Sequence, residues 1–344
     1  MDRTIAPRTS EKLMTEITTK HKQRRRFAGV YPVLYAFFDA TGRLDHRAMQ
    51  QQVEHCIDAG AHGITVLGLV TEVNRMNEGE RREVVEVVND ALHGRLPYAV
   101  TIGEPTPAAQ IAFAAHATAH GADWVILQPP PGAGLKDDEL ARHFGRVADA
   151  IDVPVAIQNN PVNLASAMSP DGLVALVRAH ENITLLKAEG WSVDIARVIE
   201  ACEGTVDAFG GHGGLEFVSL LRSGGRGLIP APDCVALQAG IFDAFESGDP
   251  ERIEVAERVH KEILPLIVLM TRSLPGLITY GKRLMAQRLG LPAVHDRAPV
   301  PAPTAFGMAE VDRVFKDVLA AERRWLVPLR SEPRRQADKE ALKL

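Results

Sequence analysis

The feature of the sequence that most restricts its fold is a series of eight short apolar runs between residues 29 and 246. Each run is followed by a loop and then by a segment with the apolar spacing of an amphipathic helix. Strands that alternate with helices in this way are parallel and are joined by crossover connections. Eight such units close a (β/α)8 TIM barrel, whereas five or six would favour an open doubly wound sheet. The runs are residues 29–37, 63–68, 98–102, 124–128, 153–158, 183–187, 206–209 and 227–230.

Helix start signals support this division. Asp45 is expected to cap the helix after the first run, and Asn77 with Glu80 three residues later has the spacing of a capping box. Thr106 and Ser169 each stand before a proline, which is favoured at the first helical position.

The pattern changes after Ser247, where the sequence predicts three helices without strands between them, at residues 251–270, 275–289 and 308–327. The fold class is therefore α/β, a TIM barrel with a C-terminal helical extension. The expected parts are an N-terminal tail (1–26), the barrel (27–246), C-terminal helices packed on the barrel (247–329) and a loose tail (330–344).

Charge and composition exclude several classes of function. A net charge of −5 provides no positive field for nucleic acid. We interpret the basic run at 20–26 as a solvated tail, with an anion-binding arm as the less favoured alternative. No apolar run reaches the roughly 18 residues that a membrane span needs. Cys56, Cys202 and Cys234 lie far apart, which indicates buried thiols in a reducing cytoplasm and no disulfide framework.

Lys187 is the leading catalytic candidate because it closes the sixth apolar run, at the barrel end where active sites lie. A lysine in a buried strand is costly unless it is paired or neutral, and a neutral amine attacks ketones. Side chains alternate along a strand, so Glu189 points the same way and is placed to move protons. Alternatively, Lys187 points outward between helices, or pairs with Glu189 in a purely structural role.

Other residues at strand ends are candidates for binding or proton transfer. Catalytic candidates besides Lys187 and Glu189 are Tyr35 and His212. Substrate-binding candidates are Gly68, Thr71, Glu72, Asn159 and Gly211.

Several motifs in this order resemble the dihydrodipicolinate synthase/N-acetylneuraminate lyase family of class I aldolases, over about residues 29 to 329. They are residues 29–33 and 38–45, then 68–72 with Glu80, then Asn159 with Pro161, and finally Lys187. The resemblance implies that Lys187 forms a Schiff base with pyruvate or a related 2-keto acid. It further implies a homo-oligomer, a dimer or tetramer, that needs no organic cofactor.

The sequence departs from that family at several catalytic positions. Leu69 and Val70 stand where the family has two hydroxyl residues, and Gln158 replaces a tyrosine after strand 5. The family's catalytic tyrosine after strand 4 corresponds to Pro130 or Pro131, which cannot donate a proton.

A hydroxyl residue before Glu72 is the pattern of the sugar-acid dehydratases of this family, and Thr71 fits it. The resemblance therefore favours the dehydratase side, with Thr71 and nearby backbone amides holding the substrate carboxylate.

A glycine-rich segment, residues 210–214, follows the seventh run. It has two interpretations: a phosphate or flavin site, as at this end of other barrels, or room for the backbone to approach a keto-acid tail. His212 is an acid/base candidate or an ordinary loop histidine. His116 and His120 lie one turn apart on a crossover helix without an adjoining carboxylate in the sequence, so we expect no metal site.

The sequence thus predicts a class I lyase that performs aldol cleavage, condensation or dehydration on pyruvate or a 2-keto-3-deoxy acid. Its partners would be small molecules, without nucleic acid or membrane. Two alternatives remain: a phosphate-binding barrel enzyme of another class, for which Lys187 is dispensable, and a non-catalytic barrel that senses a keto acid.

Overall fold

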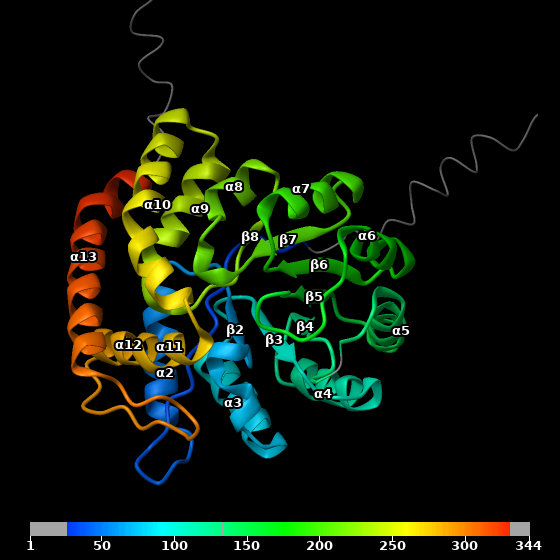
Figure 1. Cartoon of the computed structure of the whole chain (residues 1–344), viewed down its shortest axis with the longest axis horizontal. Coiled ribbons are helices and arrows are strands. Elements are labelled where there is room, and N and C mark those ends of the chain that lie inside the picture. Colours follow the sequence, from blue (N-terminus) through cyan, green and yellow to red (C-terminus); the bar gives the residue numbers. More distant parts are fainter. Residues whose placement is uncertain (1–25, 133, 331–344) are drawn as a thin grey trace, which may run out of the picture.

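The computed structural model describes residues 26–132 and 134–330 (Figure 1). Apart from Arg26 and Arg330, the two predicted tails, 1–26 and 330–344, fall outside these described residues, and so do residues 20–25 of the basic run.

Eight parallel strands form one sheet in the described chain, in the order β1-β8-β7-β6-β5-β4-β3-β2. The expected number of strands is confirmed. The strands are β1 (Gly29–Val30), β2 (Ile64–Val66), β3 (Tyr98–Ile102), β4 (Trp124–Leu127), β5 (Val155–Asn159), β6 (Ile183–Ala188), β7 (Asp207–Gly210) and β8 (Gly227–Leu228).

Hydrogen bonds between the segment that follows β1 and strand β2 close the sheet into a barrel. The Thr65 amide donates to the Pro32 carbonyl (2.9 Å), and the Leu34 amide donates to the Thr65 carbonyl (3.0 Å). On the other side, the Tyr31 amide donates to the Leu228 carbonyl (2.8 Å). Only two residues of the predicted run 29–37 form a regular strand, and Pro32 contributes to this because it has no N–H to donate.

Each strand is followed by a helix, and the predicted caps are confirmed. Asp45 accepts from the Ala48 amide, Asn77 and Glu80 form a capping box, and Thr106 and Ser169 cap their helices. The helices are α2 (His46–Asp58), α3 (Glu78–Leu92), α4 (Pro107–Ala119), α5 (Asp137–Ala148), α6 (Pro170–Ala179), α7 (Ser192–Ala201), α8 (Phe217–Arg222) and α9 (Val235–Ser247).

The C-terminal helices lie beside the barrel in Figure 1, where α10 and α13 run next to α9. They are α10 (Pro250–Thr271), α11 (Leu274–Gly276), a π-helical segment (Leu277–Gly281), α12 (Lys282–Leu289) and α13 (Ala305–Arg330), close to the three predicted helices. No single described helix is long and apolar enough to cross a membrane. Only α10 taken together with Leu274–Leu289 meets the length and composition criterion, as a pair bent by 105°.

Aromatic side chains fill the inside of the barrel. Trp124 on β4 and Phe209 on β7 pack with ring centroids 5.6 Å apart, although their strands are not neighbours, so the contact crosses the interior. Tyr31 packs against both rings. A Cβ atom on Gly63 would lie 2.0 Å from the Tyr31 ring, so this position requires glycine. The interior is therefore a packed core, and only its carboxyl end is left for a ligand.

The three cysteines are free and buried, as the sequence predicted.

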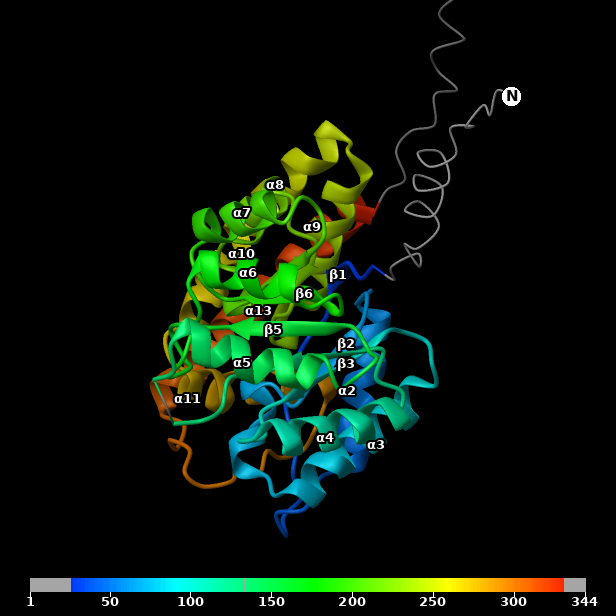
Figure 2. The same ribbon diagram turned by 90° about the vertical axis from the view of Figure 1, so that its right-hand side faces the viewer.

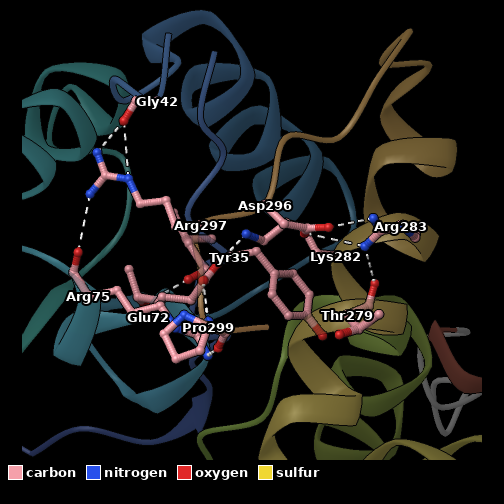
Figure 3. Close-up of polar contacts among 12 residues, drawn as sticks. Tyr35, Gly42, Glu72, Arg75, Thr279, Lys282, Arg283, Asp296, Arg297 and Pro299 are labelled. Carbon is pink, nitrogen blue, oxygen red and sulfur yellow. Dashed lines mark hydrogen bonds and ion pairs between the residues drawn. The ribbon is translucent and has the colours of Figure 1, made fainter. Parts of the chain in front are cut away.

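A buried ion pair ties the C-terminal helices to the barrel. Lys282 at the start of α12 donates to Glu72, which follows β2, and both side chains are fully buried. The second Glu72 oxygen accepts from Arg75 (2.5 Å), whose guanidinium also reaches the Pro299 carbonyl (2.6 Å) (Figure 3). Burial lowers the pKa of Lys282, and Glu72 opposes this shift. Removing one partner would leave the other charge buried and unpaired.

We predict that Glu72→Gln lowers the free energy of unfolding by about 3–5 kcal/mol, as is typical when one partner of a buried ion pair is removed. Urea denaturation monitored by circular dichroism measures the change. Glu78→Gln is the matched control, because Glu78 pairs with Arg82 on the surface of α3, where such a pair is worth about 0–1 kcal/mol. Equal effects of the two substitutions would contradict the assignment.

Candidate active site

A small cavity of about 70 Å³ lies at the carboxyl ends of the strands. Lys187 and Glu189 reach it from β6 and the residues that follow, and Asn160 and His212 reach it from the segments after β5 and β7. The C-terminal helices supply part of the wall, including Leu274 of α11. In Figure 2 the carboxyl end of β5 and helix α11 lie on the same side of the molecule.

Lys187 lies on β6 between the two neighbouring strands, paired in register with Gln158 of β5 and Phe209 of β7. Its side chain is 5% exposed, and its Nζ atom lies 3.8 Å from Glu189 Oε2. That is the one ion pair of Lys187 among the described residues. The amine is thus shielded from bulk water yet faces the cavity, and it does not point outward between the helices.

Glu189 is held by two amide side chains. Its Oε2 atom accepts from Gln158 Nε2 (2.6 Å) and from Asn160 Nδ2 (2.9 Å). The Gln158 amide is itself oriented, because its Oε1 atom accepts from Gln128 Nε2 (2.9 Å). Three amide side chains from the ends of the neighbouring strands β4 and β5 therefore fix the carboxylate beside the Lys187 amine.

The glycine-rich segment after β7 leaves room for this carboxylate. A Cβ atom on Gly211 would lie 2.2 Å from Glu189 Cγ, so a larger residue there would displace Glu189. His212 adopts a left-handed conformation (φ 49°), and its Nε2 atom is buried without a hydrogen-bond partner among the described residues. Glu189 and His212 thus face the same cavity.

Leu69 and Val70 line the cavity where the resembled family has hydroxyl groups. They begin the 3-10 turn Leu69–Thr71, and the first amides of a helical turn have no partner within the turn. The apolar side chains therefore leave backbone N–H groups as the donors on this wall.

Several other candidates hold structural contacts. The Tyr35 hydroxyl donates to buried Asp233 (2.9 Å), and burial, then Asp233, raises the Tyr35 pKa well above its usual value. Thr71 donates to the Leu34 carbonyl (2.7 Å). Asn159 exchanges two hydrogen bonds with the backbone of Met168.

Gly68 and Glu72 are likewise occupied by the local fold. A Cβ atom on Gly68 would lie 2.7 Å from Val33, and Glu72 is taken up by Lys282 and Arg75. Of the nine candidates, the structure brings Lys187, Glu189 and His212 to the cavity wall, with Gly211 against Glu189.

The sequence pattern predicted no role for Gln128 or Asn160, and it did not predict that the C-terminal helices form part of the cavity wall. Alternation along a strand could have signalled Gln158, which pairs in register with Lys187. Asn160 follows the fifth run closely, but it lies beyond the end of β5, where alternation no longer applies, so the sequence could not show that it faces the cavity.

A second crevice of about 280 Å³ adjoins the first and shares Glu189 and His212 with it. Trp191, which is 62% exposed, stands at its edge. The rest of the wall is mostly apolar and comes from α7, α8 and β8, including Ile195, Phe217, Leu220 and Leu228.

Only one group of three His, Cys, Asp or Glu side chains within residues 26–132 and 134–330 has ligand atoms close enough to share a metal ion. It consists of Glu86, His116 and His120 on the outer helices α3 and α4.

Comparisons with known proteins agree on one family. The model of the dihydrodipicolinate synthetase family matches residues 26–316. The chain is 28% identical to the 4-hydroxy-tetrahydrodipicolinate synthase of Methanopyrus kandleri over 69% of this chain and 79% of that protein. It is 26% identical to an Escherichia coli protein named as a probable 2-dehydro-3-deoxy-D-pentonate aldolase, over 78% and 89% of the two chains.

Among solved structures, the 4-hydroxy-tetrahydrodipicolinate synthase of Methylacidiphilum fumariolicum SolV superposes with a TM-score of 0.81 at 21% identity. The alignment covers 88% of this chain and 99% of that one. At this identity the similarity establishes the fold.

Proposed function

The chain belongs to the dihydrodipicolinate synthetase family and is a lyase that acts on a keto acid, and we propose that Lys187 is the amine that binds the substrate covalently. The observation that carries this proposal is a buried lysine amine that faces a cavity, 3.8 Å from a carboxylate oxygen. The substrate is pyruvate or a 2-keto-3-deoxy acid.

In the proposed reaction, the Lys187 amine adds to the C2 carbonyl, and the adduct takes up a proton and loses water to give an iminium ion. The iminium withdraws electrons from the C3 bonds. In aldol cleavage, a base takes the C4 hydroxyl proton and the C3–C4 bond breaks, which releases an aldehyde and leaves an enamine. The enamine takes up a proton at C3 and becomes an iminium again. In dehydration, a base takes a C3 proton and passes a proton to the C4 hydroxyl, which leaves as water. Hydrolysis of the iminium then frees the product and the lysine.

Glu189 is the proposed proton carrier. The positions that correspond to the family's tyrosines hold Pro130 or Pro131 and Gln158, and none of these side chains transfers a proton. Glu189 adjoins the Lys187 amine, and the amides of Gln158 and Asn160 fix its orientation. His212 faces the same cavity and is the competing candidate.

The substrate carboxylate would lie against the turn that begins at Leu69. Thr71 is less suited to hold it, because its hydroxyl already donates to Leu34. The backbone amides of Leu69 and Val70 supply donors whatever their side chains are.

The geometry around the glycine-rich segment argues against the phosphate-binding alternative. Glu189 lies against Gly211 and would repel a phosphate there. The Gly214 amide, a donor that a phosphate would need, already donates to the Gly211 carbonyl (2.9 Å). The keto-acid sensor differs from the enzyme only in turnover, which the assays below measure.

For the organisation of the chain, we propose a barrel domain over 27–246 with the 247–329 helices packed on it. A homo-oligomer in the cytoplasm remains our expectation, and sedimentation of the purified protein tests the oligomer.

The 280 Å³ crevice is the proposed site for the part of the substrate beyond C4. It shares Glu189 and His212 with the Lys187 cavity, so a chain that extends from the iminium past these residues enters it. Among the described residues, its lining contains no lysine or arginine, while Glu189 and Glu216 would repel a second acidic group. We therefore propose an uncharged distal group, an aryl or branched alkyl group that packs against Trp191.

We predict that borohydride traps a covalent adduct of pyruvate on the wild-type protein, and that Lys187→Ala abolishes the mass gain. Lys187→Arg also fails, because guanidinium keeps its charge and cannot form the imine. Mass spectrometry of the intact protein measures the adduct. Lys261→Ala removes an exposed lysine of α10 and retains the adduct. Absence of any adduct on the wild type with a panel of 2-keto acids would overturn the Schiff-base proposal.

Glu189→Gln is expected to lower turnover by about 10²- to 10⁴-fold, the usual contribution of a positioned acid or base, while the trapped adduct persists. Turnover of a 2-keto-3-deoxy acid and borohydride trapping are measured on the same preparation. His212→Ala tests the competing assignment. Wild-type turnover in both variants would exclude both residues, and adduct formation without turnover in the wild type would favour the sensor.

For the distal crevice, we predict that pyruvate condenses with benzaldehyde or isobutyraldehyde in preference to succinic semialdehyde. Trp191→Ala should lower kcat/KM for benzaldehyde by roughly 10-fold, which is within the range for lost apolar contacts in a pocket. The same substitution should leave kcat/KM for the small aldehyde glycolaldehyde almost unchanged. Val193→Ala alters an exposed neighbour outside the crevice and serves as control. Preference for the charged aldehyde would refute the distal assignment and leave the Lys187 adduct untouched.

A further inference from the structure

We infer that Glu86, His116 and His120 form a binding site for a divalent transition metal, Zn²⁺ in particular, on the outside of the barrel. His116 and His120 lie four residues apart on one face of α4, and Glu86 approaches them from α3. One ligand atom from each residue lies within 4.8 Å of the others. The spacing of the two histidines is visible in the sequence, whereas Glu86 comes from another helix and could not be assigned to the pair from the sequence.

Both histidines present their Nε2 atoms to the same Glu86 oxygen. His120 Nδ1 lies 2.9 Å from the His116 carbonyl, an acceptor, so Nδ1 carries the hydrogen and Nε2 keeps its lone pair. This arrangement, in which the second ring nitrogen donates to a carbonyl, is usual for histidines that bind metals. His120 Nε2 faces Glu86 Oε1 at 3.8 Å.

His116 provides independent evidence. Its Nε2 atom is buried and has no hydrogen-bond partner among the described residues, and it lies 3.5 Å from Glu86 Oε1. A buried polar atom without a hydrogen-bond partner destabilises the folded state, and such atoms are rare in native proteins unless an ion or a water molecule satisfies them. A metal ion between Nε2 and the carboxylate would satisfy it.

Arg82 lies on α3 one turn before Glu86, and its positive charge opposes a metal ion at this cluster. Glu78 partly neutralises that charge, because its Oε1 atom accepts hydrogen bonds of 3.0 and 2.7 Å from the Arg82 guanidinium.

The ligand set selects the kind of metal. Two imidazole nitrogens and one carboxylate oxygen suit Zn²⁺, which binds such sets in tetrahedral geometry, with water in the fourth position. Mg²⁺ and Ca²⁺ prefer oxygen ligands. The Glu86 side chain is 48% exposed, which gives the ion access from solvent. A bound ion would clamp α3 to α4, away from the proposed chemistry of Lys187, and this inference does not depend on that proposal.

The test is calorimetric titration of untagged, metal-free full-length protein with ZnCl₂. We expect one Zn²⁺ per chain and an increase of Tm by about 4 °C at a free Zn²⁺ concentration 100 times Kd. Mg²⁺ should produce neither effect. His120→Ala and Glu86→Gln should weaken binding by more than the roughly 10- to 100-fold that loss of an outer-shell partner causes. His120 is partly exposed and at the surface, so His120→Ala tests the site even if His116→Ala fails to fold.

His46→Ala is the matched control, because His46 pairs with Glu83 in a surface pair of one histidine and one carboxylate. It should bind Zn²⁺ as the wild type does. Co²⁺ substitution gives a second readout, since d–d absorption bands of a tetrahedral ion should appear in the wild type and be lost in His120→Ala. Absence of Zn²⁺ binding, or unchanged Zn²⁺ affinity in both His120→Ala and Glu86→Gln, would overturn the inference.

Discussion

A carboxylate buried at Glu189 imposes most of the arrangement around Lys187, because a buried charge must be paired or accept hydrogen bonds. The amides of Gln158 and Asn160 supply those bonds, and Gln128 fixes which end of the Gln158 amide faces the carboxylate. The requirement extends to the backbone, since Gly211 must lack a Cβ atom for Glu189 to fit. The Glu189 carboxylate thus determines which residues fit at four places: the end of β4, the end of β5, the segment after β5 and the segment after β7.

The cavity is not a property of the barrel alone. Part of its wall comes from Met270, Leu274 and Leu277, which follow the last barrel unit. The ion pair of Lys282 with Glu72 holds α12 against the segment after β2, and Leu69 and Val70 of that segment face the cavity. The Lys282–Glu72 ion pair lies outside the cavity, yet it holds together two parts of the cavity wall, the segment after β2 and the C-terminal helices.

The sequence predicted the strands and helices, because these follow from hydrophobic periodicity and from capping residues. It was less informative about contacts between side chains of different strands, helices and loops. Eight apolar runs gave the strands, and alternation along β6 placed Lys187 and Glu189 on one side. Alternation fails in loops, so the choice between Asn159 and Asn160 could not be made from the sequence. Tyr35 occupies a promising strand end, yet its partner Asp233 lies almost two hundred residues further along the chain.

The departures from the family pattern are physically connected. Gln158 stands at a tyrosine position and cannot carry a proton, but it donates to Glu189 Oε2, as Asn160 does. Both described hydrogen bonds go to that oxygen, which is also the one 3.8 Å from the lysine amine. Oε1 accepts from none of the described residues, so it is free for the proton transfer that we propose. Gln158, which cannot transfer a proton as a tyrosine could, therefore orients Glu189, the residue that we propose as the proton carrier. We interpret the glutamine at 158 and the use of Glu189 as one linked change.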